Sequence, residues 1–247
     1  MDVSVAAIYD IHGNIDALDA VLKAVESQGI ERIVIGGDVA WGPFPAEVVA
    51  RIRSLDAHFV RGNADREVAC GIAEADEVEG WVADVTEWCA GRLSTDDREF
   101  LAGMSETVVL PVIGMGDVLF CHATPRSDDE IVTAVSAEED VAAVLAGVAQ
   151  DAIICGHTHS QYDRAVGTRR VINAGSVGLP YEDRPGAYWA VIGDDVTLRR
   201  TEYDYAQAAA RIGRSGCPDA AEFAGAITSP MSRSSAIELF EARRAAR

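Results

Sequence analysis

Seven polar side chains that could bind a metal ion are spread along the sequence, each close behind an apolar run or a glycine. They are Asp10, His12, Asp38, Asn63, His122, His157 and His159. Carboxylate, amide and imidazole groups together suit divalent transition metals such as Mn, Fe, Co, Ni or Zn. Four of the five histidines of the chain belong to this set, which is hard to attribute to core packing. The set predicts a metal site, whereas Asp10 and His12 taken alone could also cap a helix.

The first two ligand candidates follow an apolar run that must deliver them. Residues 3–9 read as a short buried strand bounded by Gly13-Asn14, and side chains two apart on a strand share a face. Residues 15–27 have helical spacing, and residues 32–38 form a second strand that ends in Asp38. Such a strand, helix, strand unit is normally parallel and right-handed, with ligands beyond the carboxyl ends of its strands. Asp10, His12 and Asp38 are therefore expected to converge.

Each remaining candidate also follows a predicted strand: Asn63 after 57–61, His122 after 118–121, and His157 with His159 after 151–155. His157 and His159 would make a good pair of ligands if their segment stays extended. A thiolate zinc site of Cys155, His157 and His159 is the minor alternative, because Cys155 lies within the apolar strand. The main interpretation adds four ligands to the first three.

Other residues near these motifs could contact a substrate. Arg66 could clamp a phosphate or pair with one of many acids. Gly175 and Ser176 could offer main-chain N–H groups and a hydroxyl to a phosphate, or form only a turn. Trp41 or Phe44, in a Gly- and Pro-containing loop, could stack on a substrate ring or pack against their own domain.

Charge and composition limit the classes of partner. Lys+Arg of 21 against Asp+Glu of 40 gives a net charge of −19, which repels nucleic-acid backbone and anionic lipid. We therefore expect neither duplex nucleic acid nor a membrane as partner, and any phosphate-bearing substrate would have to be attracted locally, as by bound cations. Five cysteines without CxxC spacing argue against a disulfide framework. Without a signal-peptide pattern or membrane span, a soluble cytoplasmic protein is expected; no pattern indicates an oligomeric state.

The rest of the chain reads as further helices and strands around this site. Residues 68–105 are expected to form a helical side layer, and Ser136 with Glu139 has the pattern of a capping box that opens a helix. Residues 160–201 are β-rich, and helices are expected at 205–213 and 235–246. No repeat or linker is evident, so residues 1–247 are expected to form a single domain with C-terminal helices from about residue 204.

The order of these motifs resembles the calcineurin-like metallophosphoesterase superfamily. The pattern is Asp10-x-His12, Gly37-Asp38, Gly62-Asn63, His122 and Gly156-His157-x-His159. The turn of residues 10–14, the Gly42-Pro43 loop and the loop of residues 175–178 are similar to its small prokaryotic phosphodiesterase branch. The resemblance implies an α/β (α+β) fold in which two mixed β-sheets pack face to face and are flanked by helices, a four-layer αββα sandwich.

The resemblance also implies a site with two divalent transition-metal ions, Mn being favoured over Fe, Ni, Co or Zn. Asp38 would bridge the two ions. The other ligands of the first ion would be Asp10, His12 and His159, and those of the second ion would be Asn63, His122 and His157. A water between the metals, acidified toward hydroxide, could attack phosphorus. With Asp38, Asn63 and His12 as catalytic residues, the expected function is hydrolysis of small nucleotide-like phosphodiesters. The alternatives are a phosphomonoesterase or protein phosphatase, or a non-catalytic metal-binding scaffold.

The sequence departs from the family pattern at Ala64. Many members carry a histidine after the Gly-Asn pair, and it is considered to help protonate the leaving group; here the residue is alanine. We therefore expect substrates with good leaving groups, or acid catalysis by another group, with His12 or a metal-bound water as candidates.

Overall fold

The first sheet grows from the apolar run near the start of the chain. In this computed structural model, which describes residues 4–73 and 80–246, β1 (Val5–Ile8) pairs in parallel with β2 (Arg32–Ile35). The short β3 (His58–Phe59) continues the parallel set. On the other side, β9 (Ala187–Ile192) pairs antiparallel with β1, and β10 (Val196–Thr201) forms the edge. The predicted parallel pairing of the first two strands is confirmed.

The second sheet has the same mixture of parallel centre and antiparallel edges. Its strands, in the order β4-β5-β6-β8-β7, are β4 (Thr107–Val112), β5 (Gly116–Cys121), β6 (Ala152–Cys155), β8 (Arg169–Asn173) and β7 (Tyr162–Val166). β5, β6 and β8 run parallel, while β4 and β7 pair antiparallel with them. Two mixed sheets of five strands each thus account for the β-rich segments of the sequence.

Alternating side chains of the central strands bind the two sheets into a sandwich. Val5 and Ala7 of β1 pack in one cluster with Phe120 and Ile154 of the second sheet. The residues between them in β1 face the opposite way, toward helices. The Tyr9 hydroxyl also donates to the main-chain oxygen of Ile154, 3.1 Å away. Every second residue of a strand therefore faces the core between the sheets.

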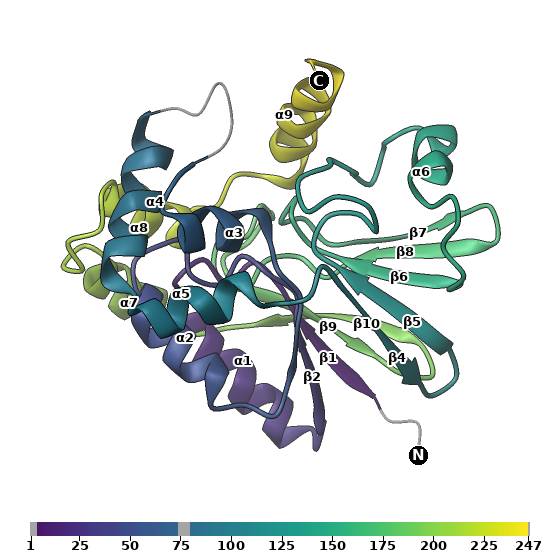
Figure 1. Cartoon of the computed structure of the whole chain (residues 1–247), viewed down its shortest axis with the longest axis horizontal. Helices are drawn as coiled ribbons and strands as arrows, with labels where there is room; N and C mark the ends of the chain where they lie inside the picture. The colour runs from purple at the N-terminus through teal and green to yellow at the C-terminus, as the bar shows by residue number, and fades with distance from the viewer. Residues whose placement is uncertain (1–3, 74–79, 247) are drawn as a thin grey trace.

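Helices cover both outer faces of the sandwich (Figure 1). The apolar cluster on the outer side of the first sheet includes residues of α1 (Ile15–Ser27), α2 (Pro45–Arg53), α7 (Tyr205–Ile212) and α8 (Ala220–Thr228). Outside the second sheet, Val141 of α6 (Glu138–Val144) packs in a cluster with residues of β5 and β6. This arrangement confirms the predicted four-layer αββα sandwich.

The predicted helical side layer consists of three helices beside the first sheet (Figure 1). They are α3 (Asn63–Cys70), α4 (Gly80–Arg92) and α5 (Thr95–Ala102). Ser94 caps α5, and its side chain accepts a hydrogen bond from Asp97 N. Residues 74–79 of this predicted layer lie outside the described residues. That the whole chain forms one domain stays a prediction.

Two helix predictions were wrong or incomplete. Ser136 does not cap α6, because the helix begins after Ala137 and the Ser136 hydroxyl donates to Glu241 in the C-terminal helix α9 (Arg233–Ala246). Helix α8 was not predicted, since Phe223 and Ile227 are its only buried apolar anchors in the structure and give a weak periodic signal.

In the described part of the chain no helix is both long and apolar enough to cross a membrane. All five cysteines are free.

Candidate metal centre

The seven predicted ligands lie at one end of the sandwich, beyond the carboxyl ends of parallel strands. Asp10 and His12 follow β1, Asp38 follows β2, Asn63 follows β3, His122 follows β5, and His157 and His159 follow β6. Parallel strands end at the same edge of a sheet, and the packing of the two sheets brings both edges together. Residues separated by almost 150 positions therefore share one site.

The ligand atoms form two groups that share one carboxylate. In each group, made of Asp10, His12, Asp38 and His159 or of Asp38, His122 and His157, the atoms lie within 4.8 Å of one another. All of these side chains except His157 are buried. Asp38 is common to both groups; that these residues bind two metal ions stays a prediction.

Three of the imidazoles are oriented so that Nε2 points into the centre. His12 Nδ1 lies 3.2 Å from the carbonyl oxygen of Trp41, His122 Nδ1 2.9 Å from that of Gly36, and His159 Nδ1 2.7 Å from that of Leu179. A carbonyl oxygen only accepts, so Nδ1 carries a proton in each ring and Nε2 is the nitrogen left to bind a cation. Metal-binding histidines are commonly held by such a bond.

Several polar atoms in the centre face one another without a proton to share, as they would around a cation. His12 Nε2 and His159 Nε2 are 3.0 Å apart. Asp10 Oδ1 is buried and has no hydrogen-bond partner among the described residues. The Asn63 side chain lies beside the second group, where its amide nitrogen donates to His157 Nδ1 at 3.2 Å and its oxygen accepts from Ala64 N at 3.2 Å. The residues present therefore fit two bound cations.

The charges in the centre are strongly coupled. Asp38 Oδ2 lies 3.5 Å from His122 Nε2 and 3.7 Å from His12 Nε2. Burial opposes ionisation of Asp38, but these imidazoles, His122 first, hold its pKa below the usual range. Burial also lowers the pKa of His122, yet Asp38 and then Asp10 outweigh it and raise this pKa to about 10. Burial, followed by a neighbouring imidazole, lowers the pKa of His12 and of His157 to about 4.

Five of the ligands have a left-handed backbone conformation that residues other than glycine rarely adopt. The φ angles are 52° at Asp10, 45° at His12, 53° at Asp38, 66° at His157 and 57° at His159. The prediction that Asp10 and His12 lie on one strand was therefore wrong, since β1 ends at Ile8. The segment of His157 and His159 does not stay extended either, because β6 ends at Cys155. Such conformations each cost roughly 1–3 kcal/mol and cluster where the surroundings impose them.

A family model described as the calcineurin-like phosphoesterase superfamily domain matches residues 3–194. The chain belongs to this superfamily. An uncharacterized protein of Methanocaldococcus jannaschii is 27% identical over 234 residues, which cover 87% of this chain and 94% of that protein. Similarity to known proteins thus supports the family that the motifs suggested, and a phosphoester substrate follows from the family.

Two solved structures are similar to this phosphoesterase over nearly its whole described length. A hypothetical protein from Pyrococcus horikoshii OT3 is 21% identical with a TM-score of 0.79, over 93% of this chain and 99% of that one. A metallophosphoesterase from Sphaerobacter thermophilus is 23% identical with a TM-score of 0.72, over 93% and 100%. At these identities the likeness shows the shared fold.

The loop that carries Asp38 in the phosphoesterase is held by a buried carboxylate that the sequence prediction missed. Asp65 accepts main-chain hydrogen bonds from Asp38 (2.7 Å), Val39 (2.8 Å) and Gly62 (3.0 Å). Burial, then the charge of Asp38, raises the pKa of Asp65 to about 7. Its position as the acid in the first turn of α3, two residues after Asn63, was the available signal.

Replacing Asp65 by alanine is expected to destabilise the metal-free phosphoesterase by about 3 kcal/mol or more, because buried N–H donors would lose their acceptor. Denaturant unfolding would measure the loss, and Mn²⁺ titration would show weaker binding as the Asp38 loop relaxes. Asp84→Ala, on an exposed position of α4, is the control and should be near neutral. Equal stability of the two variants would contradict the assignment of Asp65.

The loop with Gly175 and Ser176 supports the metal centre from behind. The buried Ser176 hydroxyl donates to the main-chain oxygen of Asp10 (2.7 Å) and accepts from Leu179 N (2.8 Å). Gly175 N donates to the Asn173 side chain, 2.8 Å away. These groups are used within the protein, so the geometry gives the loop a role in holding the Asp10 turn rather than in the predicted contact with a phosphate.

Other predicted alternatives also receive structural roles. Trp41 donates from Nε1 to the Thr86 hydroxyl (3.1 Å), and Phe44 packs beneath the guanidinium of Arg211. Burial raises the pKa of Cys155 to about 12, and neither ligand group contains a cysteine, which disfavours the thiolate site. Because His12 Nδ1 donates to the Trp41 carbonyl and Nε2 faces the other candidate ligand atoms, the geometry favours its role as a ligand over that of proton donor.

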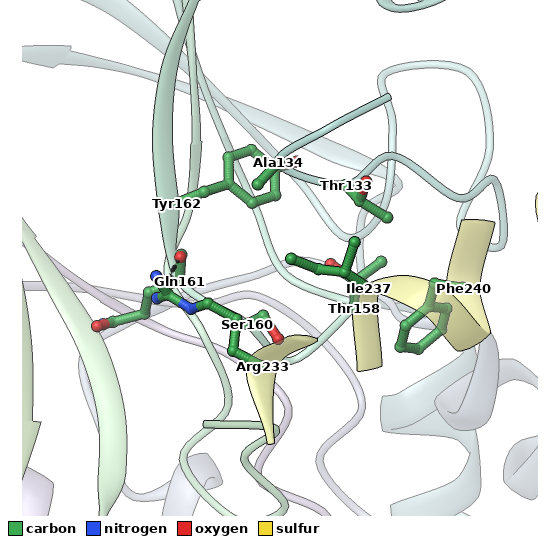
Figure 2. Close-up of a pocket in the computed structure, with 9 residues that line it drawn as sticks. All are labelled: Thr133, Ala134, Thr158, Ser160, Gln161, Tyr162, Arg233, Ile237 and Phe240. Atoms are coloured by element: carbon green, nitrogen blue, oxygen red, sulfur yellow. Dashed lines mark hydrogen bonds between the residues drawn. The ribbon is translucent and has the colours of Figure 1, made fainter. Parts of the chain in front are cut away.

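The C-terminal helix α9 packs beside the metal centre. The sequence predicted this helix but not its position. The ring of Phe240 lies 6.4 Å from His157 and 6.1 Å from Tyr181, and Tyr181 stacks on His159 at 4.8 Å. Figure 2 shows Phe240, with other residues of α9, facing the segment that follows the two histidine ligands. Contacts from the last helix of the chain therefore border the metal centre.

Proposed function

We propose that the protein is a metal-dependent phosphodiesterase that hydrolyses small nucleotide-like phosphate esters. The observation that carries the proposal is the pair of buried ligand groups that share Asp38. Two divalent cations would bring +4, and Asp10 with Asp38 returns −2, which leaves about +2 at the centre of a chain with a net charge of −19. Such a centre attracts a phosphoryl group although the rest of the surface repels it.

The donor set supports divalent transition metals, with Mn²⁺ as our preferred cofactor. Asp10, His12 and His159 would hold one ion, Asn63, His122 and His157 the other, and Asp38 both. When bound, the ions would supply Lewis acidity toward phosphoryl oxygens and an acidified water as nucleophile. The protein fixes the imidazole tautomers through main-chain carbonyls, while the neutral amide of Asn63 avoids adding a further negative charge.

The preference for diesters rests on the resemblance to the small phosphodiesterase branch and on Ala64. Its main-chain N–H donates to Asp38 Oδ1 at 2.9 Å, but its methyl group offers no proton to a leaving group. Substrates with good leaving groups are therefore favoured. A phosphomonoesterase is the alternative within the same chemistry. A non-catalytic scaffold is less well supported, because all seven ligands are retained with their supporting hydrogen bonds.

Metal-stripped protein, with and without added Mn²⁺, should be tested on bis(p-nitrophenyl) phosphate and on p-nitrophenyl phosphate. We expect Mn²⁺-dependent release of p-nitrophenol, with a higher kcat/KM for the diester. Mn²⁺ should also bind near two equivalents and raise the Tm, because ligands that bind only the folded state stabilise it. Faster turnover of the monoester would favour the phosphomonoesterase alternative. Stoichiometric metal binding without turnover of either ester, whichever divalent metal is added, would favour a non-catalytic scaffold.

A further inference from the structure

A cavity of about 350 Å³ lies directly beside the second ligand group. His122, a member of that group, lines the cavity, as do three arginines, Arg61, Arg66 and Arg126. The volume is within the range of small-molecule sites, about 300–1,000 Å³. A substrate whose phosphoester lies at the metal centre could therefore extend into this space.

The cavity is lined by more basic than acidic residues, unlike the protein as a whole. Its ionisable lining consists of the three arginines, His122 and two acids, Glu106 and Asp128, whereas acids outnumber basic residues 40 to 21 over the chain. Guanidinium groups bind phosphate through two parallel hydrogen bonds and stay charged at every physiological pH. The lining thus has the chemistry of an anion site.

The arginines differ in how firmly they are held. Arg66 donates to both oxygens of Asp128, at 2.9 and 3.2 Å, which fixes its guanidinium. Arg61 donates to the main-chain oxygen of Ala102 and to Glu106, each at the long distance of 3.4 Å, and the Glu106 side chain is 84% exposed. Arg61 Nε is buried without a hydrogen-bond partner in the described ranges 4–73 and 80–246. An exposed ion pair contributes little, so an incoming anion could replace Glu106 at small cost.

Arg126 lies in the loop that follows His122 and is the most accessible of the three. It pairs with Glu130, four residues later, and its side chain is 57% exposed. This loop also connects the cavity to the metal centre, because the main-chain oxygen of Asp128 lies 3.3 Å from the Asn63 amide. The cavity and the second ligand group are therefore parts of one continuous surface.

We propose that this cavity binds a second phosphate group of the substrate, with Arg61 and Arg126 as specificity-determining residues beside Arg66. The inference rests on the proposed function and narrows it: the substrate class is a phosphoester that carries a further phosphate, as in a nucleoside bisphosphate ester or a short oligonucleotide. A small ester without this second charge would use the metal centre alone.

The test compares binding of adenosine 5′-monophosphate and adenosine 3′,5′-bisphosphate to Mn²⁺-loaded protein by calorimetry. Wild type should bind the bisphosphate about tenfold or more tightly, as expected for a new charge-assisted hydrogen-bonded contact. In Arg61→Gln combined with Arg126→Gln, the preference should fall to about twofold or less. Arg170→Gln is the matched control, since Arg170 pairs with Asp163 and Asp195 and should keep the full preference.

Equal affinity of wild type for the two nucleotides would overturn the proposal, as would a full preference in the double variant with two Mn²⁺ bound. If the double variant unfolds, the single variant Arg126→Gln replaces it in the test, because the Arg126 side chain is exposed. This substitution should lower the preference for the bisphosphate at least about threefold. Failure of the proposed function would appear separately, as absence of Mn²⁺-dependent hydrolysis of bis(p-nitrophenyl) phosphate by wild type. The preference for the bisphosphate is measured without turnover, so its loss can be distinguished from a loss of hydrolysis.

Discussion

Replacing Asp38 by asparagine is expected to lower kcat/KM for phosphoester hydrolysis by about 10³-fold or more. The Asp38 carboxylate belongs to both ligand groups, and its Oδ2 lies within 3.7 Å of Nε2 of both His12 and His122. A neutral amide of the same size removes one of the two negative charges at the centre while it leaves the packing unchanged. The expected loss therefore reports on the charge that holds the cations, not on the fold.

Metal content separates this effect from a general loss of structure. Asp38→Asn should bind fewer than two equivalents of Mn²⁺, while its circular dichroism spectrum should match that of wild type. Asp163→Asn is the matched control, because Asp163 pairs with Arg170 on the surface of the second sheet and should keep both metals and activity. Wild-type turnover by Asp38→Asn would contradict the two-metal interpretation.

Gly62→Ala is expected to disturb the same carboxylate from its other side. A Cβ atom at Gly62 would lie 2.1 Å from Asp38 Oδ1 and 2.5 Å from Asp38 N, far inside van der Waals contact. Because Asp38 is also held by Asp65, the strain cannot be relieved by a side-chain rotation alone. We expect a destabilisation of about 1–3 kcal/mol, typical of overpacking, and at least about tenfold weaker Mn²⁺ binding because the ligand is displaced.

The matched control is Gly91→Ala in helix α4. A Cβ at Gly91 meets nothing within 4 Å in the described chain, and alanine in place of a helical glycine stabilises by about 0.5–1 kcal/mol. The Tm should therefore fall for Gly62→Ala and rise for Gly91→Ala, and the affinity for Mn²⁺ should decrease only for Gly62→Ala. Unchanged Mn²⁺ affinity in Gly62→Ala would mean that close packing against Gly62 does not position Asp38.

The local pattern of residues was enough to predict the strands, most helices and the convergence of candidate metal ligands at one site. Apolar runs, their period and the glycines that end them are local properties, so they identify a strand and the polar residue that follows it. The rule that parallel strands end at one edge then brings Asp10, His12 and Asp38 together without any knowledge of distant contacts. The pairing of the two sheets, in contrast, came from the family resemblance.

The geometry of the ligands was decided by the tertiary structure. Left-handed backbone at Asp10, His12, Asp38, His157 and His159 has no local signal, because such conformations persist only when surrounding contacts impose them. Asp65 supplies such contacts to the Asp38 loop through main-chain hydrogen bonds, and Ser176 holds the Asp10 turn from 166 residues away. These contacts, like the arginine cavity and the position of α9 beside the metal centre, depend on long-range packing, which residue spacing along the chain does not encode.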